Sequence, residues 1–233
     1  MSEKCGVHAL DRDQFRANLL LFTRKAYQML PPLKRPRILD IGCGSGVPTL
    51  ELARISGGEV TGIDADQRAL DKLKKKAAAQ NLSEKVTVVC ITMREMVFPP
   101  DSFDIVWTEG AIAFIGYESS LKEWKKLLVP GGFLVIHDRQ GILKPQLNLI
   151  EEHGFSILGQ FDVSQDDWWR HYYAPLKKYL DDLRAAEPKG GNFRNDLRIA
   201  EAEVNNFDRN SEMYASMFII LEKRRVGQTG AGQ

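Results

Sequence analysis

The stretch Ile38-Leu39-Asp40-Ile41-Gly42-Cys43-Gly44-Ser45-Gly46 carries an apolar strand into a loop with glycine at every second position. Glycine permits positive φ angles and lets a ligand approach the backbone closely. The segment that follows, 47–55, is predicted to be a helix whose first turn points free N–H groups at the loop. The loop is therefore predicted to bind a ligand at the start of that helix.

Two carboxylates indicate which ligand this loop binds. Asp64 stands 22 residues after Gly42, where an acid can accept both ribose hydroxyls of an adenosine in dinucleotide-binding and methyl-donor folds. A nicotinamide fingerprint would have glycine where Val47 stands. Asp40, at the mouth of the loop, suits a cationic amino-acid group and would repel a pyrophosphate. The loop therefore favours S-adenosylmethionine over NAD.

Short β-branched runs alternate with amphipathic segments through the first two thirds of the chain, which is typical of a parallel sheet covered on both faces. Strands are predicted at 37–41, 59–63, 86–90, 103–108, 133–137, 155–161 and 214–221, and helices at 11–30, 47–55, 66–80 and 142–153. Pro130-Gly131-Gly132 is predicted to form the turn before the fifth strand. For the N-terminal helix, core packing is favoured over a lid role.

The composition is that of an ordinary globular chain, with 43% hydrophobic and 27% charged residues among 233. The charges nearly cancel, with 32 Lys and Arg against 31 Asp and Glu, which counts against nucleic acid as a partner. The longest stretch without Asp, Glu, Lys or Arg is the 11 residues 127–137, whereas a membrane-spanning helix needs roughly 18. We therefore expect no membrane partner.

Cysteine usage and the N-terminus indicate the compartment. Cys5, Cys43 and Cys90 are odd in number and widely spaced, which suggests neither a disulfide framework nor a metal site. The N-terminus lacks the apolar core of a signal peptide. We therefore expect a cytoplasmic protein with one domain over 1–233 and a flexible tail at 226–233. The oligomeric state is left open.

Four signals in the right order make residues 37–152 resemble the class I S-adenosylmethionine-dependent methyltransferases, in particular their small-molecule, type 11-like branch. They are the glycine loop, Asp64, the block Pro99-Pro100-Asp101-Ser102-Phe103-Asp104-Ile105-Val106-Trp107 and the block Leu127-Leu128-Val129-Pro130-Gly131-Gly132-Phe133-Leu134. The resemblance implies a doubly wound α/β fold whose seven-stranded sheet has the order 3-2-1-4-5-7-6, with the last strand antiparallel.

The resemblance also implies where S-adenosylmethionine lies before it becomes S-adenosylhomocysteine. Its methionine end is expected along Asp40, Gly42 and Gly44, and its ribose on Asp64. The acid that often accepts the adenine amino group is replaced by Thr92, which leaves adenine to backbone groups and to Met93. The expected cofactor-binding residues are Asp40, Gly42, Cys43, Gly44, Gly46, Asp64, Ala65, Thr92, Met93 and Glu109.

Methyl transfer from a sulfonium needs alignment, a dry site and, for some acceptors, a base. Glu109 and His137 end the fourth and fifth predicted strands, at the edge where open α/β sheets bind ligands. Glu109 is a candidate contact of the donor or the acceptor, or else an exposed loop carboxylate. His137 and His171 are candidate general bases because imidazole titrates near neutrality, although a structural role explains His137 at least as well.

The segment 162–213 is predicted to be a helical insert before the last strand. Six of the 21 aromatic residues fall within 161–179. On a helix, one stripe is expected to pack against the sheet domain, and it consists of Trp169, Tyr172, Leu176, Tyr179, Leu180 and Leu183. We expect the insert to cap the acceptor pocket, although core packing explains its aromatic residues equally well. The predicted substrate-binding residues are Tyr117, Trp168, His171 and Tyr172.

The leading interpretation is an enzyme that moves a methyl group from S-adenosylmethionine to a small-molecule acceptor by in-line displacement. A protein or RNA methyltransferase is the alternative within the enzymes, and the lack of basic bias counts against it. A regulatory protein that binds S-adenosylmethionine without turnover is the alternative outside the enzymes, and Thr92 is the feature that favours it. No metal-ligand spacing is apparent.

Overall fold

The computed structural model describes residues 10–185 and 191–225, and the predicted tail at 226–233 lies outside them. The described residues form two compact units. The sheet unit comprises residues 20–162 and 216–225. The helical unit comprises residues 10–19 and the described part of 163–215. Within the described residues, no helix has the length and apolar character needed to cross a bilayer.

The sheet unit contains a seven-stranded sheet of order β3-β2-β1-β4-β5-β7-β6. Its strands are β1 Arg37–Ile41, β2 Glu59–Asp64, β3 Val86–Cys90, β4 Phe103–Glu109, β5 Leu128–Arg139, β6 Phe155–Val163, whose last residue belongs to the helical unit, and β7 Ser216–Lys223. β1 pairs in parallel with β2 and β4, whereas β7 runs antiparallel to β5. This topology confirms the predicted fold class.

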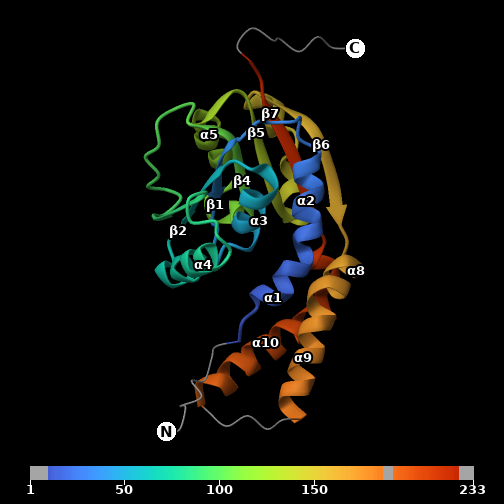
Figure 1. Cartoon of the computed structure of the whole chain (residues 1–233). Coiled ribbons are helices and arrows are strands. Elements are labelled where there is room, and N and C mark those ends of the chain that lie inside the picture. The colour runs from blue at the N-terminus through green and yellow to red at the C-terminus, as the bar shows by residue number, and fades with distance from the viewer. Residues whose placement is uncertain (1–9, 186–190, 226–233) are drawn as a thin grey trace. The chain divides into compact units, whose positions relative to one another are not determined.

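Helices flank this sheet on both faces (Figure 1). They are α2 Leu20–Gln28, α3 Val47–Ser56, α4 Gln67–Ala79, α5 Tyr117–Leu127, α6 Gln140–Leu143 and α7 Leu149–Glu152, with short 3-10 turns at Ile112–Phe114 and Lys144–Gln146. One buried cluster contains Val106 of β4, Ile136 of β5 and Ile219 of β7, together with Leu121 and Trp124 of α5. Because side chains alternate along a strand, their neighbours face the opposite layer.

Two predicted elements of the sheet unit are wrong in detail. The predicted turn at 130–132 lies inside β5, because Phe103 pairs with Leu128 and Ile105 with Phe133, so the extra residues of β5 shift the register between the two strands. The helix predicted over 142–153 is broken into α6, a 3-10 turn and α7. Pro145 lies in that turn and has no N–H to continue an α-helical ladder.

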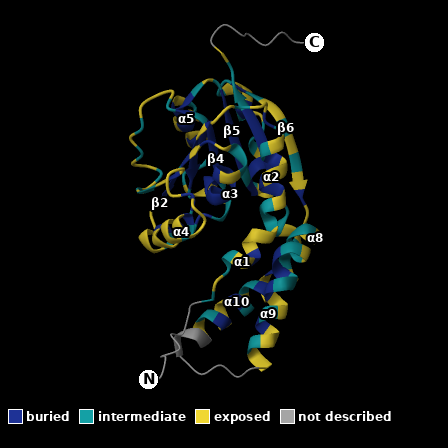
Figure 2. Cartoon of the chain, viewed as in Figure 1, coloured by how far each residue is buried: buried dark blue, intermediate teal, exposed yellow. Residues whose placement is uncertain are grey.

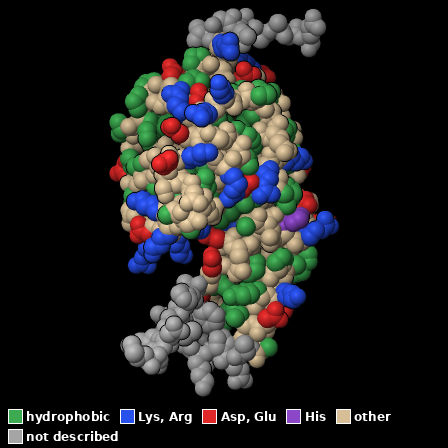
Figure 3. All heavy atoms as spheres, viewed as in Figure 1, with side chains coloured by type: hydrophobic (Ala, Val, Ile, Leu, Met, Phe, Trp, Pro, Cys, Tyr) green, Lys and Arg blue, Asp and Glu red, His purple; other side chains and the backbone are tan. Residues whose placement is uncertain are grey.

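Helix α4 shows how sequence pattern and burial agree. The Asp66 carboxylate accepts hydrogen bonds from the Arg68 and Ala69 N–H groups and so caps the helix start. One face is buried through Leu70, Leu73 and Ala77, and Figure 2 shows the outer face of α4 exposed. Figure 3 shows Lys and Arg side chains gathered over that outer face, where Lys72, Lys74 and Lys75 are exposed. The lysine run is therefore a solvated helix face.

The helical unit contains α1 Asp13–Arg16, the 3-10 turn Ala17–Leu19, α8 Gln165–Trp168, a π-helical turn Trp169–Tyr173, α9 Ala174–Ala185, α10 Gly191–Asn210 and the 3-10 turn Ser211–Tyr214. The helix expected over 11–30 is thus three consecutive segments that divide between the two units. The aromatic stripe expected to pack against the sheet forms a core inside the helical unit, in which Tyr172 and Leu176 meet Val204 and Phe207 of α10 and Phe15 of α1.

The π-helical turn has a local cause in the sequence. Pro175 has no N–H, so the carbonyl of His171 lacks its ordinary α-helical donor. The Asn18 side-chain amide donates to that carbonyl at 3.1 Å instead. The hydrogen bond that the His171 carbonyl loses within the helix is therefore replaced by one from a side chain in the N-terminal segment of the same unit.

Candidate active site

The three glycines of the loop between β1 and α3 all have positive φ, but they differ in their surroundings. A Cβ on Gly46 would lie 2.1 Å from Cδ1 of the buried Leu73, and one on Gly42 would lie 2.5 Å from Cβ of Ala111. A Cβ on Gly44 would meet no atom of 10–185 or 191–225 within 4 Å. Gly42 and Gly46 therefore allow close packing within the protein, whereas Gly44 borders open space.

Hydrogen bonds from β2 hold the loop in place. The N–H groups of Gly42 and Cys43 both donate to the carbonyl of Ile63, at 2.9 and 3.0 Å. Asp64 accepts the Gly44 N–H on Oδ2 and the Asp66 N–H on Oδ1, both at 2.8 Å. Asp64 therefore fixes the glycine loop and the start of the α4 turn at the same time, at the place predicted for a ribose.

Asp40 is a buried carboxylate directly before the loop. It is 2% exposed, and the Thr49 hydroxyl donates to its Oδ2 at 2.6 Å. Burial raises the pKa of Asp40 to about 7, helped by the negative charges of Glu109 and Asp64 and opposed by the hydrogen bond from Thr49. A carboxylate in this state gains from a cationic ligand, because the ligand compensates the lost hydration of the charge.

Glu109 ends β4 and is joined to three elements of the sheet unit. Its Oε1 accepts hydrogen bonds from the Thr23 hydroxyl of α2 and from the Trp107 indole N–H, each at 2.9 Å. Its Oε2 lies 3.7 Å from Nδ1 of His137. The side chains of Glu109 and His137 are 18% and 12% exposed. The structure thus brings together two of the three predicted catalytic residues.

His137 also has partners on β7. Its Nε2 lies 2.8 Å from the Ser216 hydroxyl, and its ring stacks on Phe218 with centroids 4.1 Å apart. These contacts hold the imidazole plane in one orientation. They give His137 a structural role as well as its place beside Glu109.

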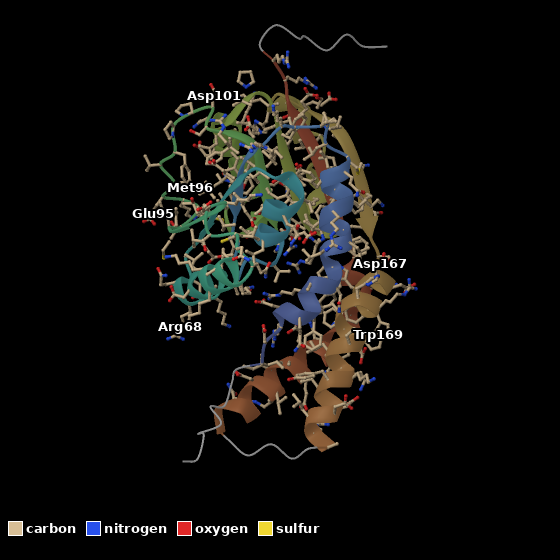
Figure 4. The ribbon with its side chains drawn as sticks, viewed as in Figure 1. Arg68, Glu95, Met96, Asp101, Asp167 and Trp169 are labelled. Atoms are coloured by element: carbon tan, nitrogen blue, oxygen red, sulfur yellow. The ribbon has the colours of Figure 1, made fainter. Side chains whose placement is uncertain are left out.

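The segment after β3 carries the residues predicted to meet adenine. The Thr92 hydroxyl donates to the Glu95 carboxylate at 2.6 Å, and Figure 4 shows Glu95 on the outer side of this loop. Cε of Met93 lies 3.7 Å from the Cβ position of Gly42, so Met93 borders the glycine loop. The Ala65 carbonyl lies 3.8 Å from Sγ of Cys90.

The four predicted substrate-binding residues divide between the units. Tyr117, at the start of α5, is 3% exposed, and its hydroxyl has no hydrogen-bond partner among the residues that the structure describes. Tyr172 in the helical unit is buried and donates to Glu203 at 3.1 Å. Trp168 packs edge-on against Tyr172 with centroids 6.1 Å apart, and His171 belongs to the same π-helical turn.

Thr23, Trp107 and Ser216 touch the candidate catalytic residues and were not predicted from the sequence. Trp107 shares a face of β4 with Glu109 because they are two residues apart, so the strand pattern could have indicated it. Thr23 lies 86 residues before Glu109, and Ser216 lies 79 residues after His137. A local sequence pattern cannot indicate contacts between residues so far apart in the chain.

The fold and the loop together are those of a Rossmann-like α/β protein, a class that binds ligands at the carboxyl ends of its strands. Residues 38–132 match the family model described as a methyltransferase domain. The matched segment 38–132 is that of a class I S-adenosylmethionine-dependent methyltransferase domain. This confirms the predicted resemblance for that segment, whereas the activity of the whole protein, its donor and the individual site residues stay predictions.

Two curated relatives illustrate the range of the family. The chain is 31% identical over 162 residues to an uncharacterized protein of Haemophilus influenzae, covering 66% of this chain and 64% of that one. It is 29% identical over 111 residues to the 27-O-demethylrifamycin SV methyltransferase of Amycolatopsis mediterranei, covering 47% and 41%. The chain therefore spans less than two thirds of the length of either relative.

Solved structures share the fold at low sequence identity. A methyltransferase of Thiobacillus denitrificans in complex with S-adenosylhomocysteine has a TM-score of 0.68 at 19% identity, covering 96% of this chain and 99% of that chain. The [4+2]-cyclase SpnF has a TM-score of 0.71 at 20% identity, covering 88% and 81%. The same architecture therefore occurs in a protein named for a different reaction.

Proposed function

We propose that the chain binds S-adenosylmethionine at the glycine loop and transfers its methyl group to a small-molecule acceptor. The observation that carries this proposal is the loop itself: Asp64 holds the Gly44 N–H, and open space borders Gly44 beside the buried Asp40. Relatives support a small acceptor, because one of them is named for methylating a rifamycin.

The residues at the loop fit this donor. Asp40 would bind its α-ammonium group, because a buried carboxylate with a raised pKa gains most from a cation. Asp64 would accept the ribose hydroxyls, and Met93 would pack on adenine. S-adenosylmethionine supplies a methyl group on a positively charged sulfur, which a nucleophile displaces in line. The protein's part is to align the acceptor and exclude water.

The acceptor is proposed to meet Glu109 and His137 at the carboxyl ends of β4 and β5, next to the loop. The near-balance of 32 basic and 31 acidic residues argues for a small molecule over nucleic acid. We place the protein in the cytosol, because Cys43 and Cys90 are free thiols and such thiols are typical of reducing compartments.

A two-part experiment tests the proposal. Calorimetry with S-adenosylhomocysteine measures donor-site binding in the wild-type chain and in Asp64→Ala. The chain is then incubated with methyl-labelled S-adenosylmethionine and a small-metabolite extract, with Glu109→Gln as the matched control. We expect binding that Asp64→Ala weakens, and labelled small molecules that Glu109→Gln reduces. Absence of binding would contradict the donor assignment.

A regulatory protein that binds the donor without turnover is the second candidate, because Thr92 stands where an acid is expected and bonds to Glu95. Binding of S-adenosylhomocysteine with no labelled product would favour this candidate. Label in protein or RNA added to the same assay, with none in the metabolites, would favour a macromolecular acceptor.

A further inference from the structure

The Glu109 carboxylate is held by two donors that come from different elements. Thr23 of α2 and Trp107 of β4 both donate to Oε1 at 2.9 Å. The two donors are 2% and 0% exposed, so neither bond competes freely with water. An ionised carboxylate only accepts hydrogen bonds. Two buried donors on one oxygen therefore fix the plane of the carboxylate.

The second oxygen of Glu109 has a different environment. Oε2 is 3.7 Å from Nδ1 of His137, beyond a normal hydrogen bond. The imidazole is kept in place by the stacking of Phe218 and by the Ser216 hydroxyl near Nε2. Oε2 can therefore accept a further hydrogen bond, in a side chain that is 18% exposed. The neighbouring imidazole is held in place and leaves this oxygen in one position.

We propose that Thr23 and Trp107 are positioning residues, which hold Glu109 so that Oε2 accepts a hydrogen bond from the acceptor's nucleophilic group. The inference rests on the proposed methyl transfer and assigns a role to helix α2 beyond covering the sheet. Thr23 acts only through Glu109, so its loss removes orientation without removing a contact to the donor.

A matched pair of variants at position 23 tests the role. Thr23→Val removes the donor at nearly constant volume, and Thr23→Ser keeps it. With methyl-labelled S-adenosylmethionine and the metabolite extract, we expect Thr23→Val to slow labelling by about tenfold, the factor for one hydrogen bond to a charged group, and Thr23→Ser to retain most of the rate. Affinity for S-adenosylhomocysteine should stay within about twofold in both variants.

A double-mutant cycle separates positioning from general loosening of the fold. In the Glu109→Gln background, Thr23→Val should slow labelling by less than about twofold, because its target group is already changed. Ser120→Ala is the control, since it removes a buried hydroxyl that donates to the carbonyl of Gly116, the residue before α5. An equal loss of rate from Thr23→Val in both backgrounds, or no loss in either, would overturn the proposal.

A third measurement does not depend on turnover. The indole N–H proton resonance of Trp107, assigned by its absence in Trp107→Phe, reports its hydrogen bond to Glu109 and should shift in Glu109→Gln. Thr23→Val should also shift this resonance at constant pH, and Thr23→Ser should restore it. If no labelled product forms, the proposed function fails and this resonance alone decides the link: an unchanged position in Thr23→Val refutes it.

Discussion

Thr49 donates a 2.6 Å hydrogen bond to Asp40, a carboxylate that is 2% exposed at the mouth of the glycine loop. This bond opposes the burial that raises the pKa of Asp40 to about 7. Because a cationic donor group requires the ionised form, binding of S-adenosylhomocysteine should weaken as pH falls below about 7. Calorimetry across pH checks this, with Asp40→Asn as the control that should lose the dependence.

Thr49→Val tests the cause of that pH dependence. Removing the hydroxyl should raise the pKa of Asp40 further, so that affinity at neutral pH falls by about tenfold and recovers at higher pH. A variant with unchanged affinity and an unchanged pH profile would show that Asp40 does not bind the donor's ammonium group.

The same residue predicts a pH dependence of stability. The pKa of Asp40 rises from its ordinary value of 3.8 to about 7 in the folded chain, so the folded state binds more protons than the unfolded state between these values. This group's contribution to the free energy of unfolding therefore falls as pH rises through that window. Urea unfolding of the wild type and Asp40→Asn should show the largest gain for the variant above pH ~7.

Alanine at two glycines of the loop should have separable effects. Gly46→Ala combines a φ of 81° with a Cβ placed 2.1 Å from Leu73, and should lower the free energy of unfolding by about 2–4 kcal/mol. Gly44→Ala has a φ of 51° and open space, so it should cost about 1–2 kcal/mol. Urea unfolding measures both costs, and equal costs would contradict the packing role of Gly46.

Calorimetry then separates the roles in binding. Gly44→Ala should lose affinity for S-adenosylhomocysteine because its Cβ projects into the space predicted for the ligand. Unchanged affinity in this variant would place the donor elsewhere along the loop.

Asp64→Ala should weaken donor binding by roughly 1.5 to 3 kcal/mol, the range for hydrogen bonds to a charged group. The matched control is Asp66→Ala, which removes the cap of α4 and should cost about 1 kcal/mol of stability with little change in affinity. Calorimetry with S-adenosylhomocysteine measures the two affinities. Equal weakening in both variants would show that Asp64 acts by organising the turn, since it also holds the Gly44 and Asp66 N–H groups.

Tyr117→Phe tests a predicted substrate contact. The Tyr117 hydroxyl is buried and has no hydrogen-bond partner in the described part of the chain, so its removal should leave the free energy of unfolding unchanged or raise it by up to about 1 kcal/mol. If the hydroxyl binds the acceptor, the KM for labelled transfer should rise while affinity for S-adenosylhomocysteine stays constant. A clear loss of stability would instead indicate a partner within the fold.

Trp168→Ala and His171→Ala test the substrate-binding residues predicted in the helical unit. If these residues bind the acceptor, both variants should slow acceptor labelling and retain donor affinity. Arg184→Ala is the control in the same unit, because it breaks an exposed ion pair with Glu201 and such pairs contribute little. Circular dichroism checks that both variants fold, and normal turnover in both would contradict the predicted role of these residues.

Much of the sheet unit could be predicted because its signals are local. Glycine at positions 42, 44 and 46 and the apolar strand before them indicate a strand-loop-helix unit within ten residues. The register shift in β5 could not be predicted, because Pro130-Gly131-Gly132 is typical of a turn. The sequence does not indicate that the residues before it also pair with β4. The broken helix around Pro145 was missed because the apolar spacing continues past the proline.

The sequence by itself determined the fold class, the glycine loop predicted to bind the donor and the acid at the end of β2, because each depends on backbone conformation and on residues close together in the chain. Only the tertiary structure decided that Thr23 and Trp107 share one oxygen of Glu109, that Ser216 reaches His137, and that the aromatic stripe packs within its own unit. The physical reason is that side-chain hydrogen bonds and ring contacts depend on distances of a few ångströms. Those distances arise only when elements far apart in the chain are packed together.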